Sequence, residues 1–330
     1  MVEYILFSVF AASFIATLLF TPYWIKRAKS VNLVGKDMHK VYSEPIVEAG
    51  GISVIIGFIF GLLVYVAIHI FYFKDDFKSL YILAVMSSIL IMTIIGLLDD
   101  LLGWKKGLKQ WQKPLIVLIA ALPIIVINAG RSIMWVPFLG PIDFGLFYTF
   151  LLIPIGIAGA ANGFNMIGGY NGLETGLGLI ILATLGFISW EVGVAWVSVI
   201  ALCMVFALLA FYIFNKYPAR VFPGNVLSYS VGALIAIVAI LGNIEKFALI
   251  LFIPYFIEFV LKARGRFKKE SFARVNSEGS LDIPYDKIYG IEHLAIKLLK
   301  KIKSKVYEKD VVYFLYGLEI ILAGIVLLII

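Results

Sequence analysis

Residues 80–98 read LYILAVMSSILIMTIIGLL, an unbroken run without a charged side chain, and Asp99 and Asp100 follow it directly. An α-helix needs about 20 apolar residues to cross the roughly 30 Å hydrocarbon core of a bilayer, so this run is long enough to span one. The whole chain agrees, because 62% of its 330 residues are hydrophobic and only 15% are charged. A water-soluble protein of this size needs more polar surface than that. We therefore predict an integral membrane protein.

Nine further apolar runs bring the number of candidate spans to ten. The ten lie near residues 3–24, 46–73, 79–98, 112–128, 143–161, 172–189, 191–214, 226–242, 245–262 and 311–330. The expected fold class is an all-α polytopic membrane protein with about ten transmembrane helices, and residues 1–330 form a single integral membrane domain. The first run lacks a basic segment before it and a small-residue cleavage site after it, so we expect it to remain as the first span.

Lysine and arginine residues gather on one side of these spans. The loops on that side lie near residues 25–45, 99–111, 162–171, 215–225 and 263–310, and the segments around them hold 24 of the 28 basic residues. Because basic loops stay in the cytoplasm, we expect an active site on the cytoplasmic face of the cell membrane and both termini outside. Basic residues placed beside apolar spans also explain the net charge of +7, so we do not expect nucleic acid as a partner.

The last cytoplasmic loop, residues 263–310, is long enough to have structure of its own. Two short β-prone segments, 272–275 and 281–283, flank a turn-like Asn-Ser-Glu-Gly, which predicts a small β-hairpin. Residues 291–305 alternate leucine and isoleucine with lysine at helical spacing, which is typical of an amphipathic helix at a membrane interface. A solvated basic linker is the alternative interpretation of this last segment.

Asp99 and Asp100 are unusual at the end of an apolar helix. Two carboxylates at a helix C-terminus oppose the helix dipole and each other, so a positive charge must offset them. Lys105, Lys106 and Lys109 follow within ten residues, and a bound divalent cation would serve as well. An ordinary solvated helix end would explain the pair if no other polar motif accompanied it.

Residues 162–174 read NGFNMIGGYNGLE, with three asparagines, four glycines and no basic residue between strongly apolar spans. Amide oxygens are good ligands for hard cations, and glycines let the backbone approach phosphate groups at the start of the next helix. The motif therefore suits a nucleotide diphosphate with a metal ion. Close helix packing is the simpler explanation for Gly172.

Two further cytoplasmic motifs have both a functional and a simpler interpretation. Residues 215–225, NKYPARVFPGN, end in a Pro-Gly turn, and a helix cap would explain Gly224 and Asn225 without any function. Arg264 and Arg266, two residues apart, could clamp a diphosphate. Both arginines are equally explained as anchors at the cytoplasmic side of the last spans.

Taken in this order, the motifs resemble the polyprenyl-phosphate N-acetylhexosamine-1-phosphate transferase family, and most closely its archaeal and eukaryotic dolichyl-phosphate branch. The resemblance covers nearly the whole chain and begins at GKDMHK, residues 35–40, and PIVEAGG, residues 45–51. It implies transfer of GlcNAc-1-phosphate, or a related HexNAc-1-phosphate, from a UDP-sugar to dolichyl or polyprenyl phosphate with release of UMP. This would be the first membrane step of lipid-linked oligosaccharide synthesis for protein N-glycosylation.

The resemblance also implies the partners and the cofactor. The partners would be UDP-GlcNAc or a related UDP-HexNAc, dolichyl or polyprenyl phosphate and membrane lipid, and a homodimer is compatible with the sequence. The cofactor would be Mg²⁺, with Mn²⁺ able to replace it.

The residue roles follow from the same resemblance. Asp99, Asp100 and Lys109 would be catalytic, Lys109 lying at the spacing of the family's pyrophosphate-binding lysine, and Asn165 and Asn225 would bind the metal. Met38 would contact the uridine, Phe222 would stack on uracil, and the arginine pair would bind the diphosphate and the sugar. The full set of implied substrate contacts is Lys36, Asp37, Met38, Glu48, Asn162, Gly169, Asn171, Phe222, Arg264, Gly265 and Arg266.

Two departures from the family pattern matter. Asn225 stands where the family usually has a metal-binding aspartate, so one ligand would lack a charge. The only histidines are His39, His69 and His293, whereas the peptidoglycan branch has a histidine-rich motif, which argues against a MurNAc-pentapeptide substrate. A secondary transporter is the rival function, but transporters place polar residues at the bilayer midplane in inverted repeats. A structural scaffold would leave the asparagines and aspartates unexplained.

The distribution of basic residues gives a test of orientation. A reporter fused at Lys36 or Lys268 should lie in the cytoplasm, and one fused at Arg131 should lie outside, because basic loops are retained inside. Protease or reagent access in intact cells measures the side. A reporter at Lys268 that is reached from outside would contradict the placement of the active site.

Overall fold

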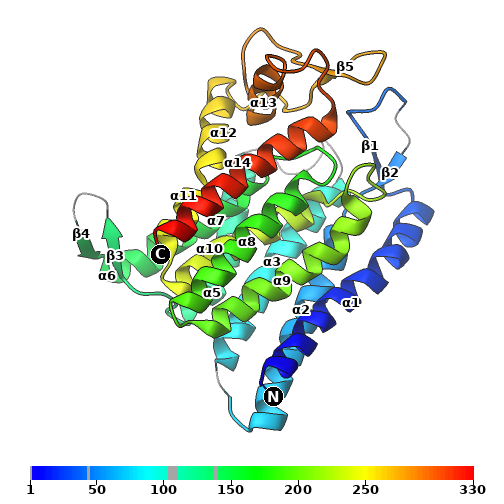
Figure 1. Cartoon of the computed structure of the whole chain (residues 1–330). Helices are drawn as coiled ribbons and strands as arrows, with labels where there is room; N and C mark the ends of the chain where they lie inside the picture. The colour runs from blue at the N-terminus through cyan, green and yellow to red at the C-terminus, as the bar shows by residue number, and fades with distance from the viewer. Residues whose placement is uncertain (1, 43–44, 77, 103–110, 137–139) are drawn as a thin grey trace.

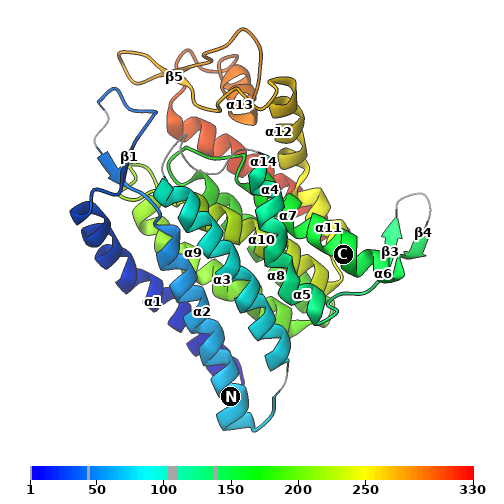
Figure 2. The same cartoon turned by 180° about the vertical axis from the view of Figure 1, so that it is seen from behind.

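The computed structural model describes residues 2–42, 45–76, 78–102, 111–136 and 140–330. It shows a bundle of long helices with strands β1 and β5 and helix α13 gathered at one end (Figure 1). Both chain termini lie away from that end, as the view from behind also shows (Figure 2). We call it the loop end. It comprises the first loop (residues 31–42 and 45–50), the third loop (165–172), the fourth loop (216–223) and the last loop (265–307), numbered in the order of the predicted cytoplasmic loops.

Eight helical segments of the described chain are long and apolar enough to cross a membrane. The helices in them are α1 (Val2–Ser30), α2 (Gly51–Ala67, continued by a π-helical turn, Ile68–Phe73), α3 (Ser79–Leu102), α6 (Gly145–Phe147) with a π-helical turn (Tyr148–Leu152) and α7 (Ile153–Phe164), α8 (Leu173–Glu191), α9 (Ala195–Asn215), α10 (Gly224–Gly242) and α14 (Glu308–Leu328). This confirms the predicted all-α polytopic membrane fold.

The two remaining predicted spans, near 112–128 and 245–262, are helical but interrupted. The first consists of α4 (Gln112–Val117), a 3₁₀ turn (Leu118–Ala121) and α5 (Leu122–Val126), and the second of α11 (Glu245–Leu251) and α12 (Ile253–Arg264). Pro123 and Pro254 stand in the first turns of α5 and α12. Proline has no backbone N–H to continue a helix but fits the first turn of a new one, so each run restarts there.

The described part of the chain also contains three small antiparallel hairpins. The predicted hairpin in the last loop is confirmed, with β5 (Arg274–Val275) paired to β6 (Leu281–Asp282). Two hairpins were not predicted, and they are formed by β1 (Val34–Lys36) with β2 (Pro45–Val47) and by β3 (Ile133–Val136) with β4 (Gly140–Asp143). Val47 also forms an isolated parallel bridge with Val221, which ties the first loop to the fourth.

Helix α13 (Ile291–Leu299) is the amphipathic helix predicted over 291–305, but it ends six residues earlier. Ile291 and Ile296 are buried, and the helix packs against α12 and α14. Its apolar face is therefore covered by protein instead of lying free at a membrane interface.

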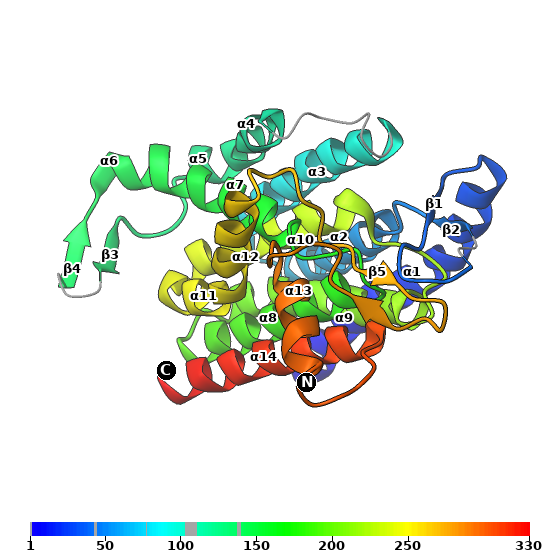
Figure 3. The same cartoon turned by 90° about the horizontal axis from the view of Figure 1, so that it is seen from above.

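Helix α10 is the most buried of the eight candidate spans and lies in the middle of the bundle (Figure 3). Two glycines allow this close packing. A β-carbon at Gly96 of α3 would lie 2.7 Å from the carbonyl oxygen of Asn225, and one at Gly232 would lie 2.6 Å from the carbonyl oxygen of Ala160 on α7. Small residues let helix backbones approach in this way inside membranes. Gly96 thus brings the end of α3 against the start of α10.

The Gly96 contact predicts that Gly96→Ala pushes α3 away from α10. We expect a lower melting temperature in detergent. Because alanine is the better helix former by about 1 kcal/mol, this loss of stability would have to come from the wider separation of the two helices. Gly324→Ala is the matched control, because nothing lies within 4 Å of a β-carbon at that position of α14. Equal melting temperatures for the two variants would contradict the assigned role of Gly96.

Candidate active site

Asp100 of α3 caps the N-terminus of α10. Its Oδ1 accepts a hydrogen bond from the backbone N–H of Asn225 at 2.8 Å, and its Oδ2 accepts one from Val226 at 3.2 Å. The first N–H groups of a helix have no partner within the helix, and the positive end of the helix dipole favours an anion there. The start of α10 therefore stabilises a carboxylate that the end of α3 disfavours.

Asp99 is buried beside it, and two of its partners lie among the described residues. Its Oδ2 lies 2.6 Å from Nζ of Lys113 and accepts a hydrogen bond from Nδ2 of Asn225 at 2.9 Å. The predicted partners Lys105, Lys106 and Lys109 lie outside the described residues. Lys113, at the start of α4, was missed because we considered only lysines within ten residues of the pair.

Asn165 joins the same place through α10. Its Oδ1 accepts a hydrogen bond from Ser228 Oγ at 2.5 Å, and Ser228 lies one helical turn after Asn225. Asn162, in contrast, donates to the carbonyl of Ala158 within its own helix, at 2.8 Å. The first turn of α10 therefore gathers the aspartate pair and two of the predicted asparagines, and Ser228 is a polar member that the sequence motifs did not indicate.

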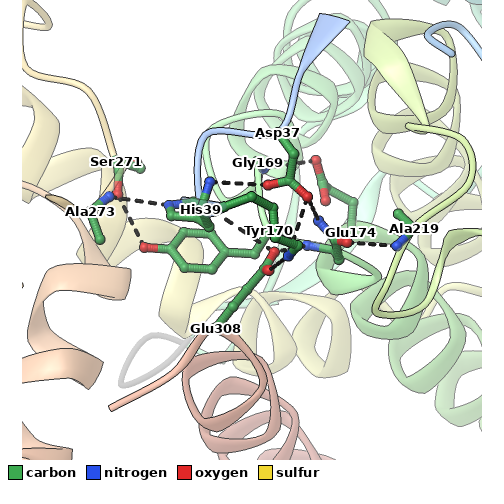
Figure 4. A network of polar contacts seen from close by, with 11 residues as sticks. Asp37, His39, Gly169, Tyr170, Glu174, Ala219, Ser271, Ala273 and Glu308 are labelled. Carbon is green, nitrogen blue, oxygen red and sulfur yellow. Dashed lines mark hydrogen bonds and ion pairs between the residues drawn. The ribbon is translucent and has the colours of Figure 1, made fainter. Parts of the chain in front are cut away.

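Asn171 ties three segments of the loop end together, and its partners Asp37, Ala219 and Glu308 are labelled in Figure 4. Its backbone N–H donates to Oε1 of Glu308 at 2.7 Å, and its side-chain Nδ2 donates to Oδ2 of Asp37 at 3.1 Å. Its Oδ1 accepts from the backbone N–H of Ala219 at 2.7 Å. Both polar atoms of this buried side chain are thus bonded within the protein, which makes Asn171 a framework residue whatever else it contacts.

Lys40 supplies positive charge to the same network. Its Nζ lies 2.5 Å from Oε2 of Glu308 and 3.3 Å from Oδ2 of Asp37, and it stands 4.0 Å from the ring centre of Tyr217. Burial alone would lower the pKa of Lys40, but the hydrogen bond and charge of Glu308 and the charge of Asp37 raise it above its usual value. Lys40 therefore stays protonated between the two carboxylates.

Asp37, His39 and Glu308 also place one potential metal-ligand atom each within 4.8 Å of the others. The carboxylates already accept hydrogen bonds from the backbone N–H groups of His39 and Asn171. Lys40 beside them offsets one of the two negative charges without an ion. We therefore interpret the cluster as a structural tie between the first loop and α14.

The other predicted substrate residues also belong to the loop end or its edge. Lys36 and Met38 are exposed, and Glu48 is half-buried at the end of β2, where burial raises its pKa. Phe222 pairs with β2 through its backbone, its N–H donating to the carbonyl of Val47 at 2.7 Å. The backbone N–H of Gly169 donates to Glu174 at 3.1 Å.

The arginine pair lies where α12 ends. Arg264 is its last residue, Gly265 is half-buried, and Arg266 adopts a positive φ of 51°. Both arginine side chains are exposed at the loop end. Within the described chain they form no ion pair with the other predicted site residues, so a role for them depends on a ligand.

Comparison with known proteins shows that the chain is similar to a glycosyl transferase family and to several named proteins. The family model described as glycosyl transferase family 4 matches residues 81–243, from α3 to the end of α10. A Saccharolobus solfataricus protein assigned the name UDP-N-acetylglucosamine--dolichyl-phosphate N-acetylglucosaminephosphotransferase is 39% identical over 95% of this chain and 93% of its own length. A Sulfolobus acidocaldarius protein of the same assigned name is 32% identical over 94% and 92%. A Streptococcus thermophilus phospho-N-acetylmuramoyl-pentapeptide-transferase is 31% identical over 75% of each chain.

The interpretation of Lys40 can be tested by Lys40→Met. Removing the cation leaves two buried carboxylates without compensation, which typically costs about 3–5 kcal/mol. We expect a clearly lower melting temperature, partly restored when Glu308→Gln is added. Lys309→Met is the matched control, because Lys309 also lies over Tyr217, at 4.5 Å, but is exposed. A Lys40→Met protein as stable as that control would contradict the interpretation.

Proposed function

The chain belongs to glycosyl transferase family 4, and from that premise we propose that it transfers GlcNAc-1-phosphate from UDP-GlcNAc to dolichyl phosphate and releases UMP. The loop end then faces the cytoplasm, where UDP-sugars are found. The observation that carries the proposal is the cluster at the first turn of α10, where the aspartate pair, Lys113, Asn165 and Asn225 meet. Similarity over 95% of the chain to a relative assigned that activity supports it.

The reaction joins two anions, so the site must offset charge before chemistry can occur. An oxygen of the lipid phosphate forms a bond to the sugar-bearing phosphorus of UDP-GlcNAc, and the bond from that phosphorus to the bridging oxygen breaks. UMP leaves with the electron pair, and the product is a lipid diphosphate carrying GlcNAc. Such transfers depend on positioning and charge stabilisation more than on covalent help from the protein. Lys113 and the start of α10 are the positive groups at this place.

The two aspartates have different parts in this proposal. Asp100 uses both carboxylate oxygens to cap α10, so it acts as a positioning residue. Asp99 holds Lys113 and the amide of Asn225 and is the group available to keep the attacking lipid phosphate deprotonated. A two-step route through an aspartyl phosphate on Asp100 would first have to break the cap, so we favour direct transfer.

The family also implies a divalent metal, Mg²⁺ or Mn²⁺, and the donor set fits it. The Nδ2 atom of Asn225 faces Asp99, so its amide oxygen is directed away from that carboxylate. The Oδ1 atom of Asn165 accepts a hydrogen bond from Ser228 and has a second lone pair. Asn165 and Asn225 would hold Mg²⁺, which prefers oxygen ligands and is usually bound by one or two carboxylates plus substrate phosphates, so the substrate diphosphate would supply negative charge at the metal. When bound, the metal would offset diphosphate charge.

The substrate contacts proposed from the family resemblance are placed to complete this site. Lys36, Met38, Glu48, Gly169 and Phe222 lie on the three loops that Asn171 and β2 tie together, so they would form the uridine side. The exposed arginine pair with Gly265 would bind the diphosphate and the sugar. Asp37 and Asn171 would act mainly by holding these loops.

The proposal is tested by incubating purified protein with Mg²⁺, dolichyl phosphate and a panel of UDP-sugars and measuring UMP. We expect release with UDP-GlcNAc and a fall of about 10²-fold in kcat for Lys113→Met, since losing one preorganised charge contact costs on that order. Lys29→Met, on an exposed residue at the end of α1, is the control and should keep wild-type turnover. A Mg²⁺ titration of Asn165→Ala should show a higher half-maximal concentration.

No UMP with any UDP-sugar would refute the function. Wild-type turnover in Lys113→Met would remove Lys113 from the site but leave the function standing.

A further inference from the structure

Residues 271–273 form a short strap between α12 and β5, and side chains from three other segments hold its backbone. The N–H of Ala273 donates to Nε2 of His39 in the first loop at 3.2 Å. The hydroxyl of Tyr170 in the third loop donates to the carbonyl of Ser271 at 3.5 Å, and Nε2 of His293 on α13 lies 3.3 Å from the carbonyl of Phe272. Figure 4 shows the first two of these contacts. The position of the strap is therefore set from outside it.

His39 is built to accept the Ala273 hydrogen bond. Its side chain is fully buried, and its ring stacks on Tyr170 with ring centres 4.0 Å apart and planes 26° apart. A ring nitrogen can accept a hydrogen bond only when it carries no proton. Burial lowers the pKa of His39 to about 4. Asp37 and the backbone of Gly169 favour the charged form of the ring, whereas Lys40 and His293 lower the pKa as burial does. The ring is thus neutral and available near neutral pH.

The strap brings Phe272 directly onto Gly169. A β-carbon at Gly169 would lie 2.7 Å from Cε1 of Phe272, and the φ of Gly169 is +84°, where side chains are strained. Only glycine therefore fits beneath this ring. Gly169 is exposed and lies two residues before the framework residue Asn171, in the loop that the proposed function assigns to uridine.

We propose that His39 is a positioning residue that holds the 271–273 strap against the third loop, so that Phe272 walls the uridine side of the site at Gly169. The strap then sets the affinity for the UDP-sugar, while the groups around α10 set the rate. This inference rests on the proposed function for the identity of the ligand. His39 is buried beneath the strap and acts through it, without touching the substrate.

The experiment compares His39→Gln, which keeps an amide oxygen as acceptor, with His39→Leu, which has none. Hydrogen–deuterium exchange is measured for the peptide that contains Ala273, with no nucleotide present. Loss of one hydrogen bond should speed exchange of the Ala273 amide about 3- to 10-fold in His39→Leu and much less in His39→Gln. The KM for UDP-GlcNAc should rise by a similar factor in His39→Leu with kcat nearly unchanged, and His39→Gln should restore it.

A general loss of structure would change kcat and exchange throughout the chain, so the split between KM and kcat separates positioning from misfolding. Unchanged exchange at Ala273 and an unchanged KM in folded His39→Leu would overturn the inference, as would equal damage by leucine and glutamine. If His39→Leu does not fold, Phe272→Leu decides, because shortening the wall should raise KM without slowing turnover, and a wild-type KM would refute the proposal. Wild-type protein that releases no UMP refutes the proposed function instead, and the exchange measurement still tests the strap.

Discussion

The structure depends on placing two adjacent carboxylates, one buried and one half-buried, at the end of a membrane-spanning helix. At the C-terminus of α3, Asp99 and Asp100 face the negative end of a helix dipole and each other. The cost is offset from elsewhere, by the N–H groups that begin α10 and by Lys113 at the start of α4. This arrangement is possible only if α3 and α10 touch, which Gly96 permits. The central place of α10 serves the same requirement.

A second constraint acts on the loops, which have little regular structure to hold them. Buried polar groups need partners, and here the partners come from different loops. Asn171 bonds to Asp37, Ala219 and Glu308, and Lys40 lies between Asp37 and Glu308. Each bond satisfies a buried group and fixes the distance between two loops. The loop end therefore gains its shape from side-chain ties where a soluble domain would use a sheet.

These two systems divide the proposed chemistry between them. The α10 cluster is built on helix ends inside the bundle, which suits groups that must keep their geometry while charge moves between phosphates. The loop network holds the exposed residues of the loop end. The strap completes this network, and its backbone makes single hydrogen bonds with His39, Tyr170 and His293. Donor binding and phosphate transfer can thus be altered separately by substitution.

Much of this protein could be predicted without coordinates, because hydrophobicity, run length and turn residues are local properties of the chain. They gave the membrane class, the helical character of all ten apolar runs, the hairpin at 272–283 and the order of the polar motifs. The shorter α13 and the interrupted runs at Pro123 and Pro254 differ only in where helices end, which local patterns define poorly.

Tertiary structure alone decided which charged and polar side chains meet. Asp99 pairs with Lys113, Asn165 with Ser228 across 63 positions, and Lys40 with Glu308 across 268. Asn171 is predicted to contact the substrate, and the structure adds that its side chain holds loops together. The sequence shows that a carboxylate or an amide is present, and such a group needs a hydrogen-bonding or charged partner when it is buried. Which partner it finds depends on how the helices pack. The distance between two side chains in the folded protein cannot be derived from their spacing along the chain.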